Sequence, residues 1–138
     1  MSQGKLAREH VLVCVGPRPM AQRLVRRGYR IAKRMQGTFD VMFVRTPGAN
    51  LTKREQEQLQ GVYELTRNFG GKAVELEGDS VANEIIRYAD QSGATVIVMG
   101  QSARSRVQEI MKGSIINRIM RKTKDIDIIV VADSDDVS

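Results

Sequence analysis

Two short segments of this sequence combine glycines with small, polar or basic residues, a composition suited to phosphate binding. One is Gly16-Pro17-Arg18, and the other runs from Gly100 through Ser102 and Arg104 to Gly113-Ser114. A glycine lets a phosphate approach the backbone, and a helix that begins at Ser114 would offer free N–H groups and a partial positive charge. Gly-Ser before a helix is also a common capping signal, so both interpretations stay open. The candidate nucleotide-binding residues are Val15, Gly16, Pro17, Arg18, Val44, Met99, Gly100, Ser102, Ala103, Arg104, Gly113 and Ser114.

The sequence offers few residues for catalysis or metal binding. His10 is its only histidine and Cys14 its only cysteine. Cys14 lies in the apolar run Val11–Val15, where a free cysteine usually packs as a small hydrophobe. We interpret His10, at the start of a predicted strand, as a solvated or edge residue. One Cys and one His cannot form a metal cluster, so we expect a domain that is not an enzyme and has no metal site.

Length and composition indicate a single domain. The chain has 138 residues, a net charge of +6 and a single cysteine, which fits a reducing compartment. It has no apolar stretch near the roughly 20 residues of a membrane helix and no signal-peptide core. We expect a cytoplasmic domain over residues 5–132, a disordered acidic tail over 133–138, and no membrane insertion. The positive charge favours anionic partners such as nucleotides, nucleic acids or acidic lipid headgroups.

Hydrophobic periodicity predicts the elements that would position these residues. Apolar runs predict five strands, at His10–Val15, Thr38–Arg45, Lys72–Leu76, Ala94–Met99 and Asp127–Val131. Helical spacing predicts helices at Met20–Met35, which Gly37 ends, from the capping box Thr52–Glu55 to Phe69, from Ser80 to Gly93, and from Ser114 to Lys124. Strict alternation with continuous apolar strands indicates an α/β domain with a parallel sheet and helices on both faces.

The predicted chain order places the two glycine segments together. Right-handed crossovers give a Rossmann-like, doubly wound five-stranded sheet of order 3-2-1-4-5, in which the first and fourth strands are neighbours. Ligands of such sheets bind outside the carboxyl ends of the strands, where the winding reverses. We expect Gly100–Lys112 to be a long loop at that point, because it exceeds the usual 2–6 residues or so of such connections.

The spacing of the second segment resembles the signature of the universal stress protein family. Gly100, two residues, Ala103, nine residues and Gly113-Ser114 reproduce that signature, except that Ala103 replaces its second glycine. The resemblance implies the predicted sheet and a site for the phosphates of ATP. The usual acid after the first strand of ATP-binding members is absent, because Val15-Gly16-Pro17 stands there.

One subgroup is more similar still. The segments Val11–Pro17, Leu24–Gly28, Leu76–Asp79 and Ser102–Arg106 resemble the stress-protein domain of the KdpD sensor histidine kinases. This implies a regulatory, nucleotide-binding sensory domain of a potassium or osmotic sensor kinase, with the rest of that kinase as its partner. ATP or cyclic di-AMP are the implied ligands. The stretch Phe39–Phe43 keeps the phenylalanine of the cyclic di-AMP motif but lacks its tyrosine, and Gly16–Arg18 lacks both of its serines.

Two other functions remain open. The basic residues of the first helix could track the phosphates of a nucleic acid, although few aromatic residues are available for stacking and no recognition motif occurs, which disfavours this reading. The domain could instead be a ligand-free interaction scaffold. The fifth strand, 127–131, is a predicted sheet edge, and the family resemblance implies that it could pair into a homodimer.

Overall fold

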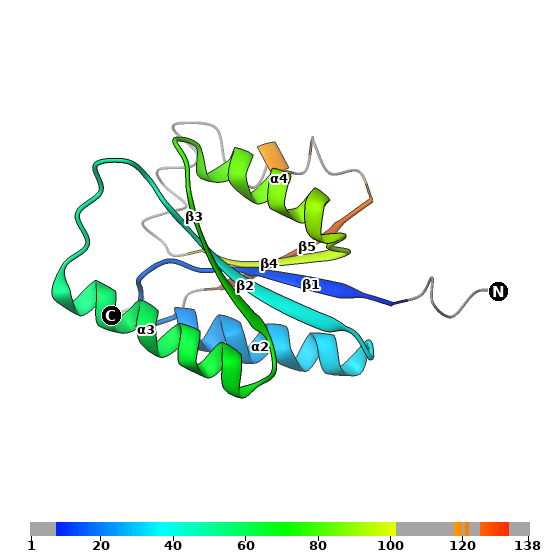
Figure 1. Ribbon diagram of the computed structural model, residues 1–138. Coiled ribbons are helices and arrows are strands. Elements are labelled where there is room, and N and C mark those ends of the chain that lie inside the picture. The colour runs from blue at the N-terminus through cyan, green and yellow to red at the C-terminus, as the bar shows by residue number, and fades with distance from the viewer. Residues whose placement is uncertain (1–7, 102–117, 120, 122–124, 133–138) are drawn as a thin grey trace.

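The computed structural model describes residues 8–101, 118, 119, 121 and 125–132 (Figure 1). From β1 to β4 its strands and helices alternate along the chain as the sequence predicts. The strands are β1 (His10–Cys14), β2 (Thr38–Arg45), β3 (Lys72–Glu77), β4 (Val96–Gln101) and β5 (Asp127–Ala132). The helices are α2 (Ala21–Arg34), α3 (Lys53–Asn68) and α4 (Val81–Ser92).

The five strands form one parallel sheet of order β3-β2-β1-β4-β5, which confirms the predicted fold. The chain first winds outward from β1 through β2 to β3. It then returns to the other side of β1 and adds β4 and β5. The winding therefore reverses between β1 and β4, whose residues Cys14 and Met99 are register partners.

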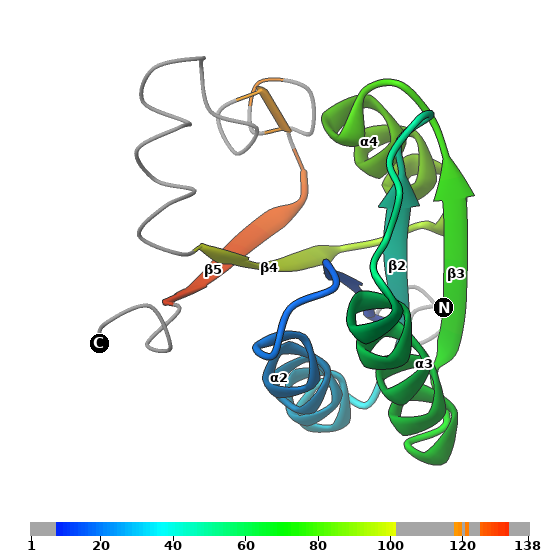
Figure 2. The ribbon, with the colours of Figure 1, turned by 90° about the vertical axis from the view of Figure 1, so that its left-hand side faces the viewer.

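The sheet separates two apolar layers (Figure 2). Helices α2 and α3 cover one face, over side chains such as Val13 and Val98. Helix α4 covers the other face, over Leu12 and Ile97. Burial of both faces explains why β1, β2 and β4 are continuous apolar runs rather than alternating ones.

The helix ends agree only partly with the sequence prediction. The capping box of α3 is confirmed, because the Thr52 side chain accepts from the Glu55 N–H while the Glu55 carboxylate accepts from the Thr52 N–H. The end of α2 is different, since the left-handed residue is Gln36, with φ 56°, and not Gly37. A Cβ on Gly37 would lie 2.1 Å from the Glu9 carbonyl oxygen. Gly37 is thus required for a close backbone approach.

The fourth strand begins and ends two residues later than predicted. Thr95 precedes the strand and bonds to the backbone of His10, and β4 continues through Gly100 and Gln101, which pair with Val131 and Ala132. The prediction that the loop begins at Gly100 is therefore wrong, because pairing with β5 extends the strand. The rest of that predicted loop, 102–112, lies outside the described residues.

Most of the last predicted helix, Ser114 to Lys124, also lies outside the described residues. Residues 118, 119 and 121 are helical. Ile119 is fully buried in the α4-side layer, and the Arg118 side chain donates to the Asn83 side chain of α4 over 3.2 Å. This part of the chain therefore packs beside α4.

A methyl group added to Gly28 should destabilise the domain. Gly-to-Ala exchanges inside helices ordinarily stabilise by about 0.5–1 kcal/mol, but a Cβ on Gly28 would lie 2.3 Å from Val13 Cγ2, in the packed contact between α2 and β1. We expect Gly28→Ala to lower the free energy of unfolding by about 1–2 kcal/mol through overpacking. Urea unfolding would measure this. Gly61→Ala in α3 is the control, because its Cβ would meet only the flexible Gln22 amide, and equal effects of both variants would contradict the prediction.

Candidate functional site

The carboxyl ends of β1 and β4 lie side by side at the winding reversal. Cys14 and Met99 are register partners, and the Val15 N–H continues the sheet by donating to the Met42 carbonyl over 2.9 Å. Gly16 lies two residues after the end of β1, while Gly100 is still paired within β4. The structure thus brings the described parts of both glycine segments to one edge of the sheet, where ligands of this architecture bind.

The loop after β1 turns sharply into α2. The Arg18 N–H donates to the Gly16 carbonyl over 2.9 Å, and the Ala21 N–H donates to the Arg18 carbonyl over 3.0 Å. Helix α2 then begins after Met20, which provides no side-chain cap, and its first turn contains no acidic residue. The first N–H groups of α2 therefore present a partial positive charge at the end of β1 without an acidic side chain in that turn to neutralise it.

The two glycines differ in what surrounds them. A Cβ on Gly16 would meet no atom within 4 Å, so open space adjoins its backbone. A Cβ on Gly100 would lie 3.2 Å from both Met20 Sδ and Leu24 Cδ1. Gly100 therefore lets the first turn of α2 approach β4, whereas α2 packing does not account for Gly16. Sequence reasoning assigned both glycines to phosphate binding and could not make this distinction.

The other predicted residues are distributed as follows. Val15 is buried in the α2-side layer, while Val44 and Met99 are buried in the α4-side layer. Pro17 is half-buried and Arg18 is exposed. Five predicted residues lie outside the described part of the chain: Ser102, Ala103, Arg104, Gly113 and Ser114.

Sequence reasoning missed the contribution of α2 to this edge. It assigned the anion-attracting helix terminus to Ser114, while the start of α2 lies next to Gly16 and, through Met20, against Gly100. The available signal was the lack of a Ser, Thr, Asp or Asn cap before Ala21, whereas the other two described helices, α3 and α4, have one.

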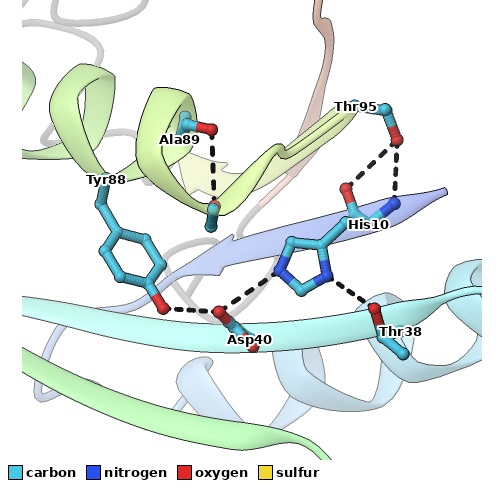
Figure 3. Close-up of polar contacts among 7 residues, drawn as sticks. His10, Thr38, Asp40, Tyr88, Ala89 and Thr95 are labelled. Atoms are coloured by element: carbon cyan, nitrogen blue, oxygen red, sulfur yellow. Dashed lines mark hydrogen bonds and ion pairs between the residues drawn. The ribbon is translucent and has the colours of Figure 1, made fainter.

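A polar network lies at the opposite edge of the sheet, where the strands begin (Figure 3). His10 Nδ1 lies 2.8 Å from Thr38 Oγ1, and His10 Nε2 lies 3.3 Å from Asp40 Oδ2. The Tyr88 hydroxyl of α4 donates to the same Asp40 oxygen over 2.5 Å, and the His10 N–H donates to Thr95 Oγ1 over 3.1 Å. The interpretation of His10 as a solvated residue or a residue of an edge strand is wrong, because β1 is the central strand and the His10 side chain is only 16% exposed.

The ionisation of these groups suits a structural role. Burial raises the pKa of Asp40, but the contacts with His10 and Tyr88 and the nearby charge of Lys72 outweigh burial and hold that pKa below its usual value. Burial and the bond to Asp40 raise the pKa of Tyr88. Asp40 is therefore a fixed carboxylate that joins β1, β2 and α4.

A groove of about 660 Å³ lies between α3 and the β2–β3 edge. Two cations line it, Arg45 and Lys53. Arg45 is already paired, with Nε 2.9 Å from a Glu75 carboxylate oxygen, and the Tyr63 hydroxyl donates to the other oxygen of Glu75. Glu57 and Glu64 add further negative charge to its lining. This groove does not favour an anion, in contrast to the edge at β1 and β4.

The described residues offer little for other chemistry. Burial raises the pKa of the Cys14 thiol to about 12, so its reactive thiolate form is suppressed. No cluster of three or more metal-binding side chains occurs in 8–101 or in the short described stretches near the C-terminus. Among the helices described, none has the length and apolar character needed to cross a bilayer.

Comparison with known proteins identifies the family. Residues 7–132 match the sequence profile described as the universal stress protein family. The chain belongs to the universal stress protein family. A putative KdpD sensor protein of Synechocystis is 38% identical over 124 residues, which cover 90% of this chain and 34% of that protein. A KdpD sensor protein of Mycobacterium tuberculosis is 33% identical over 125 residues, covering 91% of this chain and 14% of that protein.

Solved structures of universal stress proteins share the fold. One, a complex with cAMP, superposes with a TM-score of 0.71 at 19% identity, covering 91% of this chain and 98% of that one. Another, from Archaeoglobus fulgidus in complex with dAMP, has a TM-score of 0.61 at 19% identity, with the same coverage of 91% and 98%. This stress-protein domain spans about a third or less of the length of the first KdpD relatives that it matches.

Proposed function

We propose that this stress-protein domain binds a nucleotide at the carboxyl ends of β1 and β4 and acts as a regulatory module. The observation that carries the proposal is the winding reversal, where the open space beside Gly16 adjoins the start of α2. Backbone N–H groups at a helix start, next to a glycine, are suited to a phosphate. Two relatives of the same fold, in complex with cAMP and dAMP, support an adenine nucleotide as the ligand class.

The predicted second segment would complete this site. Ser102, Arg104, Gly113 and Ser114 follow β4 in the chain, so they would approach the phosphates from the side opposite Gly16–Arg18. Arg104 would contribute a charge-assisted contact. We assign no ribose or metal role to an acid, because Val15-Gly16-Pro17 stands where ATP-binding members have one.

We further propose that the domain is the cytoplasmic sensory part of a KdpD-like potassium or osmotic sensor kinase. Identity of 38% to a putative KdpD sensor protein over 90% of this chain supports this role. In that setting the rest of the kinase is its partner, and ATP or cyclic di-AMP is the regulatory ligand. The domain itself would bind without turnover, since the described site residues include neither a general base nor an activated nucleophile.

A panel of ligands should reveal a stabilising nucleotide. The panel would contain ATP, ADP, AMP, cAMP, cyclic di-AMP and cyclic di-GMP, with adenosine as the control that lacks phosphate. A ligand at about 100 times its Kd adds about 2.7 kcal/mol to the free energy of unfolding, which thermal unfolding would register as a clear rise in Tm. No shift with any member would contradict the proposal and favour a ligand-free scaffold. An equal shift with adenosine would contradict the phosphate contacts.

A further inference from the structure

Helix α2 is a strongly basic element of the protein. It contains six basic residues and no acidic one. The chain has 22 Lys and Arg and 16 Asp and Glu in all, so the residues outside α2 contain sixteen of each sign. A second basic stretch, residues 104–124, contains seven Lys and Arg and one Glu, so α2 is one of two segments in which positive charge is concentrated. Such a concentration produces a local field that attracts polyanions, which a dispersed charge of the same size would not do.

The six cations share one face of the helix, which we call the basic face. They recur at intervals of three or four residues and, at 100° per residue, fall within a sector of about 120° opposite the buried stripe of the helix. Five of them are exposed and Arg27 is half-buried. From Arg23 to Arg34 the row is about 16 Å long at 1.5 Å per residue. The basic face comprises Arg23, Arg26, Arg27, Arg30, Lys33 and Arg34.

Five cations of this face have no salt bridge within the described residues. The salt bridges there join His10 to Asp40, Arg45 to Glu75, and Arg87 to Glu84. The five are Arg26, Arg27, Arg30, Lys33 and Arg34. Arg23 donates to the Ala132 carbonyl, and the Lys33 ammonium lies over the Tyr29 ring.

Helices α3 and α4 lack such an excess of cations. Helix α3, on the same side of the sheet, contains three residues of each sign. Helix α4, on the opposite side, contains Glu84, Arg87 and Asp90, a net charge of −1. The basic helix α2 and helix α4, with its net charge of −1, thus lie on opposite faces of the sheet (Figure 2).

The side chains of the basic face disfavour two classes of partner, nucleic acids read by sequence and proteins. A sequence-reading nucleic-acid surface needs amides for base edges or aromatic rings for stacking, and the basic sector contains neither. Tyr29 stacks on Phe69 and meets Phe39 edge-on, so its ring is engaged inside the domain. A protein interface of ordinary strength needs apolar or aromatic anchors at its centre, which the centre of this row, at Arg26 to Arg30, lacks.

A planar array of phosphates needs none of these features. Five of the six cations are arginines, whose planar guanidinium groups suit phosphate oxygens. The apolar side of α2 is packed in the core, so the helix could rest on a surface but could not insert into it. Beyond Arg34, Met35 is one of the few exposed large apolar side chains in the described part of the chain, at 39%, and it could contact the headgroup region at the end of the row.

We propose that the basic face of α2 docks the domain onto a bilayer surface rich in acidic lipids. Binding is reversible and electrostatic, and it orients α4 away from the membrane. Each basic residue near an acidic surface contributes about fivefold to partitioning, within a Debye length of about 8 Å at physiological salt. The inference does not rest on the proposed nucleotide site, because neither Gly16 nor Gly100 belongs to the basic face.

Vesicle sedimentation would test this docking on the whole chain. The probes are vesicles of phosphatidylcholine alone and of phosphatidylcholine with about 30 mol% phosphatidylserine, at about 0.15 M salt. We expect binding to the acidic vesicles only. The triple variant Arg26→Gln, Arg30→Gln, Arg34→Gln should bind them about a hundredfold more weakly.

A matched triple variant separates the face from net charge. Lys53→Gln, Arg54→Gln, Arg67→Gln removes three exposed cations from α3, and circular dichroism would verify that both variants fold. The α3 variant should keep most of the binding. Equal losses in both variants would overturn the proposal, because net charge alone would then explain adsorption. Absence of binding to acidic vesicles would also overturn it, including the case in which a short DNA duplex binds under the same conditions.

Discussion

A valine in place of Gly16 should abolish nucleotide binding while the domain stays folded. A Cβ on Gly16 meets no atom within 4 Å, and its φ lies outside the left-handed region. The following Pro17 favours an extended backbone, which a β-branched residue adopts readily. The new side chain would therefore occupy the open space at the end of β1, where we propose that a phosphate contacts the backbone. We expect Kd to rise at least about a hundredfold, which corresponds to about 2.7 kcal/mol.

Calorimetric titration with the strongest nucleotide of the panel would measure this loss. The control is Gln91→Val, which places the same side chain at an exposed position in the last turn of α4, at the opposite edge of the sheet. It should bind as the parent does, and thermal unfolding should show both variants folded. A folded Gly16→Val protein with the parent's affinity would place the ligand elsewhere.

The architecture could be predicted from sequence because the signals are local. The run Val11–Val15 is continuous because both faces of β1 are covered, and such a run is visible without any structure. The capping box Thr52–Glu55 depends on four consecutive residues. Once the strands are known, the handedness of crossovers leaves few sheet orders, and the correct one follows.

Glycines show where such reasoning stops. A glycine indicates that some atom comes close or that φ is positive, but the sequence does not indicate which. Gly100 lies within a strand and admits α2, and Gly37 admits the Glu9 carbonyl, whereas Gly16 adjoins open space. Sequence reasoning predicts the role of each glycine from the residues beside it in the chain. The atoms that explain Gly37 and Gly100 belong to residues that are distant in sequence.

The network around His10 was not predicted for the same reason. Its members lie 28 to 85 residues apart in the chain and belong to β1, β2, α4 and the segment before β4. No periodicity or spacing links them. Half of the proposed nucleotide site, from Ser102 to Ser114, stays a prediction from the family signature, whereas the half around Gly16 now has a geometry.

Asp40 should contribute more to the free energy of unfolding than any exposed acidic residue of this domain. It is 7% exposed and accepts from Tyr88, with His10 Nε2 at 3.3 Å. Asp40→Ala would leave the Tyr88 hydroxyl and the His10 ring without this acceptor in a largely enclosed place. We expect the free energy of unfolding to fall by about 3 kcal/mol near pH 7. The exposed Asp90→Ala in α4 is the control and should cost less than about 0.5 kcal/mol.

The charge of Asp40 gives the effect a pH dependence whose sign is fixed. Its pKa in the folded protein is lower than in the unfolded chain. The ionised form therefore stabilises the fold at pH values above the unfolded pKa of about 3.9, and this contribution is lost as pH falls through the folded pKa. Asp40→Asn, which keeps the shape without the charge, should be less stable than the parent near neutral pH. Urea unfolding across the acid range should show the two converging as Asp40 of the parent becomes protonated. A gap that stays constant into strong acid would mean that shape and not charge holds this network together, and no gap at neutral pH would mean that the carboxylate contributes nothing to it.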